Sequence, residues 1–144
     1  MNVRGATRDD LPAIAAIERD CFPHDALPLI TFVQYLDLFA GTFLVAESDG
    51  RCAGFAIGGA SASAPEDAWL LDIAVAPDFR RHGVAQLLTT ELLARLGGRT
   101  IRATVSPDNK ASTALLARNG FVVERRVTDY FGPGEDRDVV VRRG

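Results

Sequence analysis

The chain has 144 residues, 47% of them hydrophobic and 24% charged, which is typical of a soluble globular protein with one substantial core. Its net charge of −3 and its pI near 5.3 argue against a general nucleic-acid-binding protein, because such proteins are usually basic. No stretch is typical of a signal peptide or a membrane span, so we expect a cytoplasmic protein with no membrane partner.

The first half of the chain predicts one strand, two helices and a β-hairpin. Thr7 and Asp10 have the spacing of a capping box at the start of the first helix, and Pro23 ends that helix. Asp49 and Gly50 form a strong turn signal between two β-rich runs. The expected elements are a strand at 2–7, the helix that Pro23 ends, a helix at 27–41, and strands at 42–47 and 51–59.

The second half predicts strands that alternate with helices. Its first strand, at 68–75, is nearly all apolar, so we expect it at the centre of the sheet. It is followed by a helix whose apolar residues recur every fourth position. The elements after this strand are a helix at 84–96, a strand at 100–106, a helix at 109–119, and strands at 121–129 and 136–143. The last strand is either an exposed edge strand or packed inside the sheet.

These elements follow one another in the order β-α-α-β-β-β-α-β-α-β-β. That order predicts an α/β fold with a mixed sheet in a single domain, residues 1–144. Cys21 and Cys52 have no CxxC spacing, so we expect two reduced, half-buried thiols. Two histidines far apart in the chain, without a cysteine cluster, predict no metal site.

The segment PDFRRHGVA, at 77–85, lies between the apolar strand and the helix that follows it. Unpartnered backbone N–H groups and a positive dipole at a helix start can hold an anion such as phosphate. Gly83 lets the backbone approach an anion, and Arg80, Arg81 and His82 add positive charge. The plainer explanation is a solvated basic loop that needs a glycine for its turn. The patterns GxxxxGK[ST] and GxGxxG are absent, which argues against ATP, NAD and FAD.

The segment LDIAVAPDFRRHGVAQLL resembles the acetyl-CoA-binding motif of the GNAT superfamily of N-acetyltransferases. That motif is V-x-P followed by [RQ]-x-x-G-x-[GA], which Val75 to Pro77 and Arg80 to Ala85 match. RGATRDDLPAIAAIERDCF resembles the family's first strand and helix, and NKASTALLARNGF resembles its N-x-x-A/S-x-x-L-Y-x-x-x-G-F motif except at one position. The resemblance implies a GNAT-like mixed, mostly antiparallel sheet flanked by helices.

The same resemblance implies acetyl-CoA as the cosubstrate. Its pyrophosphate would lie on the backbone amides from Arg81 to Gln86, and its pantetheine arm along the backbone of Ile73 to Val75. Asn109 would contact acetyl-CoA near its reactive end, and it equally suits a helix N-cap. The implied donor-binding residues are Ile73, Ala74, Val75, Arg80, Arg81, His82, Gly83, Val84, Ala85, Gln86, Asn109 and Ser112.

Within the superfamily the chain is most similar to the ribosomal-protein-alanine N-acetyltransferases and related N-terminal acetyltransferases. CFPHDALPLITF, at 21–32, resembles the loop before that branch's second helix. Tyr130 and Phe131 fall where the branch carries a Tyr-Tyr pair. This resemblance implies a protein or peptide N-terminal α-amine as the acceptor, whereas ordinary packing at a strand end explains the two aromatic residues equally well.

The chain departs from that branch at both positions of its acid–base chemistry. Thr104 stands where the branch has a glutamate as general base, and Leu116 stands where it has a tyrosine as general acid. A neutral α-amine can still attack a thioester, because a pKa of about 8 leaves roughly a tenth of it unprotonated near neutral pH. Two alternatives therefore stay open: a small-molecule amine as acceptor, or a non-catalytic acyl-CoA-binding sensor.

Two residues are candidates to replace the missing groups. Asp72 is the polar residue of a buried strand, where burial would raise its pKa toward the range of a general base; an ion pair or hydrogen bond is its plainer role. Tyr130 is the candidate general acid. Glu47, Tyr35 and His24 are weaker candidates for these acid–base roles. We expect Glu47 to be solvated, the Tyr35 ring to be packed and His24 to be exposed. The oligomeric state stays open between monomer and homodimer.

Overall fold

The computed structural model describes residues 1–144, which form two compact units. Unit 1 consists of Met1–Gly59 and Leu71–Arg95, and unit 2 consists of Ala60–Leu70 and Leu96–Gly144. In chain order the elements are β1 (Asn2–Gly5), α1 (Leu11–Cys21), α2 (Leu29–Phe39), β2 (Phe43–Ser48), β3 (Arg51–Ala60), β4 (Asp67–Val75), α3 (Val84–Leu96), β5 (Thr100–Val105), α4 (Lys110–Arg118), β6 (Val122–Val127) and β7 (Arg137–Arg142). This order of helices and strands is the one that the sequence predicts.

The strands are hydrogen-bonded in the order β1-β2-β3-β4-β5-β7-β6, and β4 contributes residues to both units. β4 and β5 pair in parallel, whereas β1 with β2, β2 with β3, β5 with β7 and β6 with β7 pair in antiparallel fashion. The predicted α/β fold with a mixed, mostly antiparallel sheet is therefore confirmed, and so is the central place of the apolar strand.

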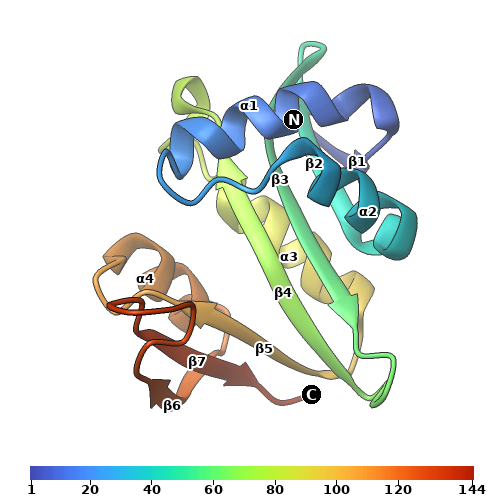
Figure 1. Cartoon of the computed structure of the whole chain (residues 1–144). Helices are drawn as coiled ribbons and strands as arrows, with labels where there is room; N and C mark the ends of the chain where they lie inside the picture. Colours follow the sequence, from blue (N-terminus) through green and yellow to red (C-terminus); the bar gives the residue numbers. More distant parts are fainter. The chain divides into compact units, whose positions relative to one another are not determined.

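In unit 1, α1 and α2 lie on one face of the strands, and α3 lies on the other (Figure 1). The predicted capping box precedes α1, where the Thr7 N–H donates to the Asp10 carboxylate at 2.7 Å. The turn between β2 and β3 also agrees with the sequence, because Asp49 and Gly50 have φ values of 51° and 76°. Positive φ at both central residues is the conformation of a tight hairpin turn.

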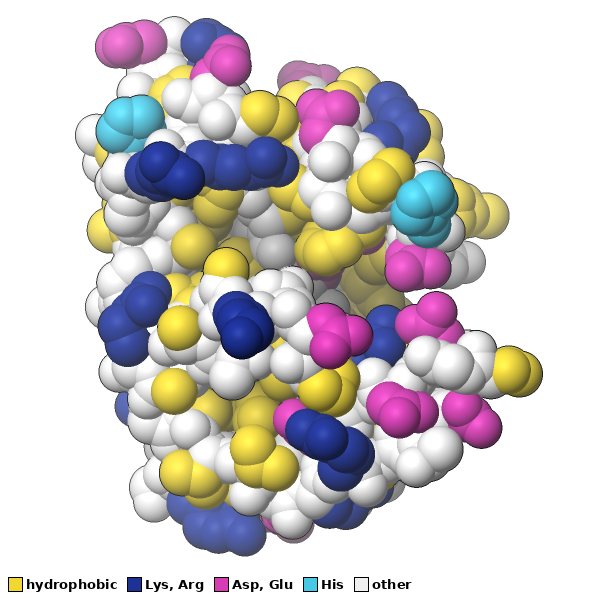
Figure 2. Space-filling view, turned by 90° about the vertical axis from the view of Figure 1, so that its left-hand side faces the viewer, with side chains coloured by type: hydrophobic (Ala, Val, Ile, Leu, Met, Phe, Trp, Pro, Cys, Tyr) yellow, Lys and Arg dark blue, Asp and Glu magenta, His cyan; other side chains and the backbone are white.

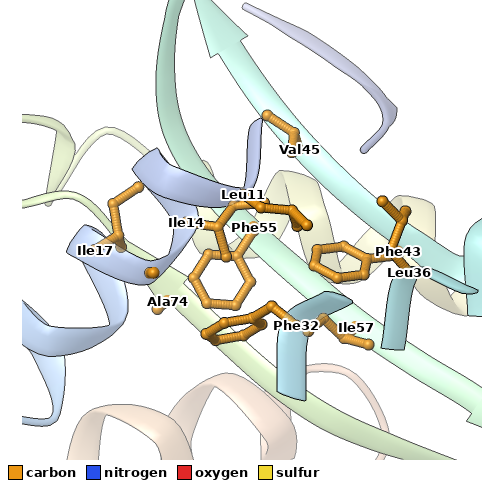
Figure 3. Close-up of a cluster of buried hydrophobic side chains, with 11 residues drawn as sticks. Leu11, Ile14, Ile17, Phe32, Leu36, Phe43, Val45, Phe55, Ile57 and Ala74 are labelled. Carbon is orange, nitrogen blue, oxygen red and sulfur yellow. The ribbon is translucent and has the colours of Figure 1, made fainter. Parts of the chain in front are cut away.

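Aromatic side chains form the centre of the core of unit 1 (Figure 3). Phe32 of α2, Phe43 of β2 and Phe55 of β3 are fully buried, and the rings of Phe32 and Phe55 meet edge to face with centroids 5.5 Å apart. Ile14 of α1 points into the same cluster (Figure 3). Ala74 of β4 also belongs to it, so the core packs directly against the strand that leads to the basic loop.

In unit 2, the start of β4 pairs with β5, and β7 lies between β5 and β6. The last strand of the chain is therefore inside the sheet, which decides between the two alternatives left open by the sequence. Asn109 is the N-cap of helix α4, and its side chain accepts a hydrogen bond from the Ser112 N–H at 3.0 Å. Leu115 and Leu116 of this helix are buried.

The structure also shows the state of the two cysteines, the grouping of residues that could bind a metal, and the length of the helices. Cys21 and Cys52 are free thiols with half-buried side chains, as predicted. No three or more His, Cys, Asp or Glu side chains gather where they could hold a metal ion. None of the helices combines the length and the apolar character needed to cross a membrane.

Candidate active site

The second half of β4 pairs closely with β3, whereas its ladder with β5 is short. That ladder covers three residues, Asp67–Trp69, and does not continue along Leu71–Val75. On the opposite side, a Cβ built on Gly54 of β3 would lie 2.7 Å from the Ala74 carbonyl oxygen, so the two backbones are in close contact. The edge of Leu71–Val75 that faces away from β3 therefore has no strand partner.

The basic loop, Pro77–Gly83, leads from β4 into α3. It begins with a short 3-10 turn, and its later residues Arg81 and Gly83 have positive φ values of 65° and 76°. Such a φ strains a non-glycine residue such as Arg81, and backbone strain of this kind gathers at functional sites. A Cβ built on Gly83 would meet no atom within 4 Å. The space beside Gly83, at the start of a 13-residue helix, is therefore open.

Positive charge surrounds the start of α3. The loop side chains at 80–82 are exposed, and Figure 2 shows Lys and Arg side chains beside a histidine near the upper edge of the face it presents. The Leu87 N–H donates to the Gly83 carbonyl oxygen at 3.0 Å, which is a hydrogen bond of the first helical turn. The N–H groups of Val84 and Ala85 come before this bond, so they have no acceptor within the helix. These amides, the helix dipole and the cationic side chains are suited to hold a phosphate group.

Cys21, the last residue of α1, connects the basic loop with β4. Its thiol donates to the Val75 carbonyl oxygen at 3.3 Å, and the Arg80 guanidinium donates to its sulfur at 3.4 Å. The thiol thus contacts two of the predicted donor-binding residues. No spacing in the sequence indicates these contacts, because the partners lie 54 and 59 residues further along the chain.

Two carboxyl groups, Asp72 of β4 and Glu18 of α1, are buried side by side in unit 1. Asp72 is 9% exposed and Glu18 is 2% exposed. One oxygen of each, Asp72 Oδ2 and Glu18 Oε1, has no hydrogen-bond partner. Burial, followed by the neighbouring Glu18 carboxyl, raises the pKa of Asp72 to about 9. Burial beside a second carboxyl therefore favours the protonated form of Asp72.

The prediction that burial raises the pKa of Asp72 is confirmed, but the pKa lies above the neutral range that suits a general base. The sequence contained a signal for the partner, because Glu18 is a charged residue in the apolar stripe with Ile14 and Ile17. Its Oε2 accepts the Leu27 N–H at 3.0 Å. The carboxyl pair is thereby linked to the segment between α1 and α2.

The remaining candidates from the family motifs lie in unit 2. The Asn109 side chain caps α4, which confirms its structural role. Thr104 of β5 is half-buried and Leu116 of α4 is buried. Tyr130 is half-buried, with its ring centroid 4.7 Å from that of Phe131. The roles of these residues toward the donor and the acceptor stay predictions.

The three weaker candidates make contacts of different kinds. The Glu47 carboxylate lies 2.7 Å from the Arg4 guanidinium and is half-buried, so the expected solvated carboxylate is instead an ion-pair partner. The Tyr35 ring packs with its centroid 6.0 Å from that of Phe39, as expected. His24 is exposed, also as expected.

Comparison with known proteins identifies the family. Residues 11–121 match the model of the acetyltransferase (GNAT) family, so the chain belongs to that family. The matched residues include α1, β4, the basic loop, α3 and α4. The match confirms the predicted family, the acetyltransferase class and acetyl-CoA as the family's donor.

The similar proteins include acetyltransferases of small molecules and of proteins. The L-2,4-diaminobutyric acid acetyltransferase of Nocardia farcinica is 33% identical over 118 residues, which are 80% of this chain and 61% of that protein. This chain therefore spans less than two thirds of that relative's length. The structure of the diaminobutyrate acetyltransferase of Paenibacillus lautus, in complex with L-2,4-diaminobutyric acid and coenzyme A, is 25% identical, with a TM-score of 0.86 over 99% of this chain and 94% of that chain. The structure of the ribosomal-protein-alanine N-acetyltransferase of Brucella melitensis is 26% identical, with a TM-score of 0.85 over 100% of both chains.

Proposed function

We propose that this chain transfers the acetyl group of acetyl-CoA to a primary amine of a small molecule with two amino groups. The observation that carries the choice of acetyl-CoA as donor is the open, positively charged start of α3 directly after the unpaired edge of β4. A phosphate-binding helix start and a free strand edge suit the two halves of one extended cosubstrate, a pyrophosphate and an amide-bearing arm.

Unit 1 contains most of the groups that would hold acetyl-CoA. The pyrophosphate would lie on the amides of Val84 and Ala85 and the amides near them, beside the loop side chains at 80–82. The pantetheine arm would hydrogen-bond along Leu71–Val75, where no strand from β5 competes for the backbone. Because the pyrophosphate end would lie at the loop, the thioester end would lie further back along β4, toward Leu71. Asn109 and Ser112 stay predicted contacts of that reactive end.

The acceptor is inferred from the chemistry of a weakly basic site. Thr104 and Leu116 supply neither the glutamate nor the tyrosine of the N-terminal acetyltransferase branch. Such a site needs an acceptor amine that is already partly neutral. In a diamine, the first ammonium group lowers the pKa of the second, because a like charge disfavours the charged form. The name of the 33% identical relative, a diaminobutyric acid acetyltransferase, supports the same class of acceptor.

A second candidate acceptor is the N-terminal α-amine of a protein or peptide. The similarity to the ribosomal-protein-alanine N-acetyltransferase of Brucella melitensis, over the whole of both chains, favours it. An α-amine also has a pKa of about 8, so a useful fraction is neutral near pH 7. The two candidates differ in what must surround the amine, either a second amino group or a peptide.

Release of coenzyme A from acetyl-CoA tests the proposal. The acceptors would be L-2,4-diaminobutyric acid, its monoamine analogues 2-aminobutyric and 4-aminobutyric acid, and one peptide with a free and with a blocked N-terminus. Preferred turnover of the diamine would support the proposed acceptor. Turnover confined to the free peptide would favour the second candidate, and donor binding without turnover of any acceptor would favour a sensor.

A further inference from the structure

The thiol of Cys21 lies at the free edge of β4, which is the edge of Leu71–Val75 without a strand partner. The Ala76 N–H donates to the Ala53 carbonyl oxygen of β3 at 2.8 Å. The C=O and N–H groups of a trans peptide point in opposite directions, so the Val75 carbonyl oxygen points away from β3. The Cys21 thiol donates to this oxygen at 3.3 Å. The end of α1 therefore meets β4 at its free edge, at the end nearest the basic loop (Figure 1).

The Arg80 guanidinium, which contacts the same sulfur, has a charge that no carboxylate neutralises. It donates to the Cys21 sulfur at 3.4 Å and takes part in no ion pair. Asp78, the one acidic residue of the basic loop, pairs with Arg51 at 3.0 Å instead. A thiol sulfur accepts a hydrogen bond without carrying a full negative charge. The contact with Cys21 therefore holds Arg80 and leaves its positive charge available to an anion.

We propose that Cys21 is a positioning residue for acetyl-CoA, and that it holds the Arg80 guanidinium beside the free edge of β4, where the pyrophosphate would meet it. The inference rests on the proposed function, because it needs acetyl-CoA at the start of α3 and along Leu71–Val75. In this arrangement Cys21 contacts neither the acetyl group nor the acceptor. It acts on the binding of the donor through Arg80.

The physical reason for such a contact is order in the side chain before the donor binds. A long arginine side chain loses rotamer freedom when an anion fixes it, and a contact that already limits this freedom raises the affinity. The hydrogen bonds from Arg80 to the sulfur, and from the sulfur to the Val75 carbonyl oxygen, form one chain from the loop to the strand. Arg80 is exposed, so this chain is what restrains its guanidinium.

The dissociation constant of acetyl-CoA, measured by isothermal titration calorimetry, tests the inference in a double-mutant cycle. Cys21→Ala removes both hydrogen bonds and should weaken binding by about 3- to 10-fold. Arg80→Ala removes the charged group itself and should weaken binding by about 10-fold or more. Because the thiol acts through the guanidinium, adding Cys21→Ala to Arg80→Ala should weaken binding by no more than about 2-fold further.

The second cysteine of the chain provides a matched control. Cys52 is also half-buried and packs against the same hydrophobic core, but its thiol donates to the Gly54 carbonyl oxygen at 3.6 Å and not to the basic loop. Cys52→Ala should therefore leave the affinity for acetyl-CoA unchanged. Thermal unfolding of every variant without acetyl-CoA measures the loss of packing separately from the loss of binding.

Two further substitutions at Cys21 separate its hydrogen bonds from its volume. Cys21→Ser keeps a group that can donate to Val75 and accept from Arg80, so its affinity should stay within about 2-fold of the wild-type value. Cys21→Val fills the space of the thiol without these hydrogen bonds and should weaken binding as much as Cys21→Ala does.

The outcomes distinguish this inference from the proposed function. Unchanged affinity in Cys21→Ala and Cys21→Val, equal losses in Cys21→Ala and Cys52→Ala, or a full additional loss in the double mutant would overturn the positioning role alone. A wild-type protein that does not bind acetyl-CoA, or an affinity that Arg80→Ala leaves unchanged, would overturn the placement of the donor and this inference with it.

Discussion

The buried carboxyl of Asp72 makes the stability of unit 1 depend on pH. Its pKa in the folded protein is raised to about 9, so the folded state holds a proton that the unfolded chain has already released. The stability from this proton is complete below the ordinary pKa near 4, and it is lost as the pH rises toward about 9, by at most about 1.4 kcal/mol per pH unit.

We expect Asp72→Asn to stabilise the fold at high pH. Asparagine has the shape of a protonated aspartate and cannot lose a proton, so the mutant should avoid the loss described above. The gain in free energy of unfolding should reach at most about 5 kcal/mol at about pH 8 and be close to zero at about pH 4. Urea unfolding at both pH values measures the difference. A gain of the same size at both would contradict the raised pKa.

The matched control for this experiment is an exposed aspartate. The Asp78 side chain is 72% exposed and pairs with Arg51, so Asp78→Asn should change the free energy of unfolding little at either pH. Comparing Asp72→Asn with Asp78→Asn therefore separates two effects on the free energy of unfolding: that of the buried proton, and that of removing one negative charge.

Single residues could be predicted where they break a local pattern, and not where their role depends on distant contacts. Asp72 stands out in an apolar strand, and Gly83 stands out before a helix. Cys21 breaks no pattern, because its contacts with Val75 and Arg80 exist only after α1 has packed against β4. Glu18 did break the apolar stripe of α1, and that signal was missed.

At the scale of elements, the contact between β3 and β4 sets the backbone of the candidate site. A Cβ on Gly54 would lie 2.7 Å from the Ala74 carbonyl oxygen and 3.3 Å from the Val75 Cα. We expect Gly54→Ala to push β4 away at these residues, to lower stability by about 1–3 kcal/mol and to weaken the binding of acetyl-CoA. Chemical denaturation and isothermal titration calorimetry measure the two effects.

Gly5→Ala in β1 is the matched control, because a Cβ there would meet no atom within 4 Å. It should change stability by less than about 0.5 kcal/mol and leave acetyl-CoA binding as it is. Normal acetyl-CoA affinity in Gly54→Ala would show that the donor does not depend on the backbone of Leu71–Val75.

The elements were predicted well because their periodicities are local. The apolar row of α3 recurs every fourth residue, and the turn at Asp49 and Gly50 is encoded by two adjacent residues. The neighbours of a strand are not encoded in this way. The run of three valines in the last strand fits an edge as well as an interior place, and only the pairing of β7 with both β5 and β6 decides it.

At the scale of the whole molecule, the donor is better determined than the acceptor. The family motif at β4, the basic loop and α3 carries the donor assignment, and the comparisons agree with it. The acceptor is only proposed, because at Thr104 and Leu116 the chain departs from the branch that it resembles. The composition does not identify the acceptor, because a net charge of −3 suits a peptide N-terminus and a small diamine alike.

The central claim is that acetyl-CoA binds at the start of α3, and two glycines with the same backbone geometry test it. Gly83 in the basic loop and Gly50 in the β2–β3 turn both have φ of 76°, and a Cβ on either would meet no atom within 4 Å. Alanine should therefore strain both positions alike, at about 1 kcal/mol. Only the methyl group at Gly83 would occupy the space expected for the pyrophosphate.

The most direct measurement is the dissociation constant of acetyl-CoA by isothermal titration calorimetry for the wild type, Gly83→Ala and Gly50→Ala. We predict binding by the wild type, unchanged affinity in Gly50→Ala and an affinity at least about 10-fold weaker in Gly83→Ala. Equal affinity in the two variants, or no binding by the wild-type protein, would contradict the placement of the donor at this helix start.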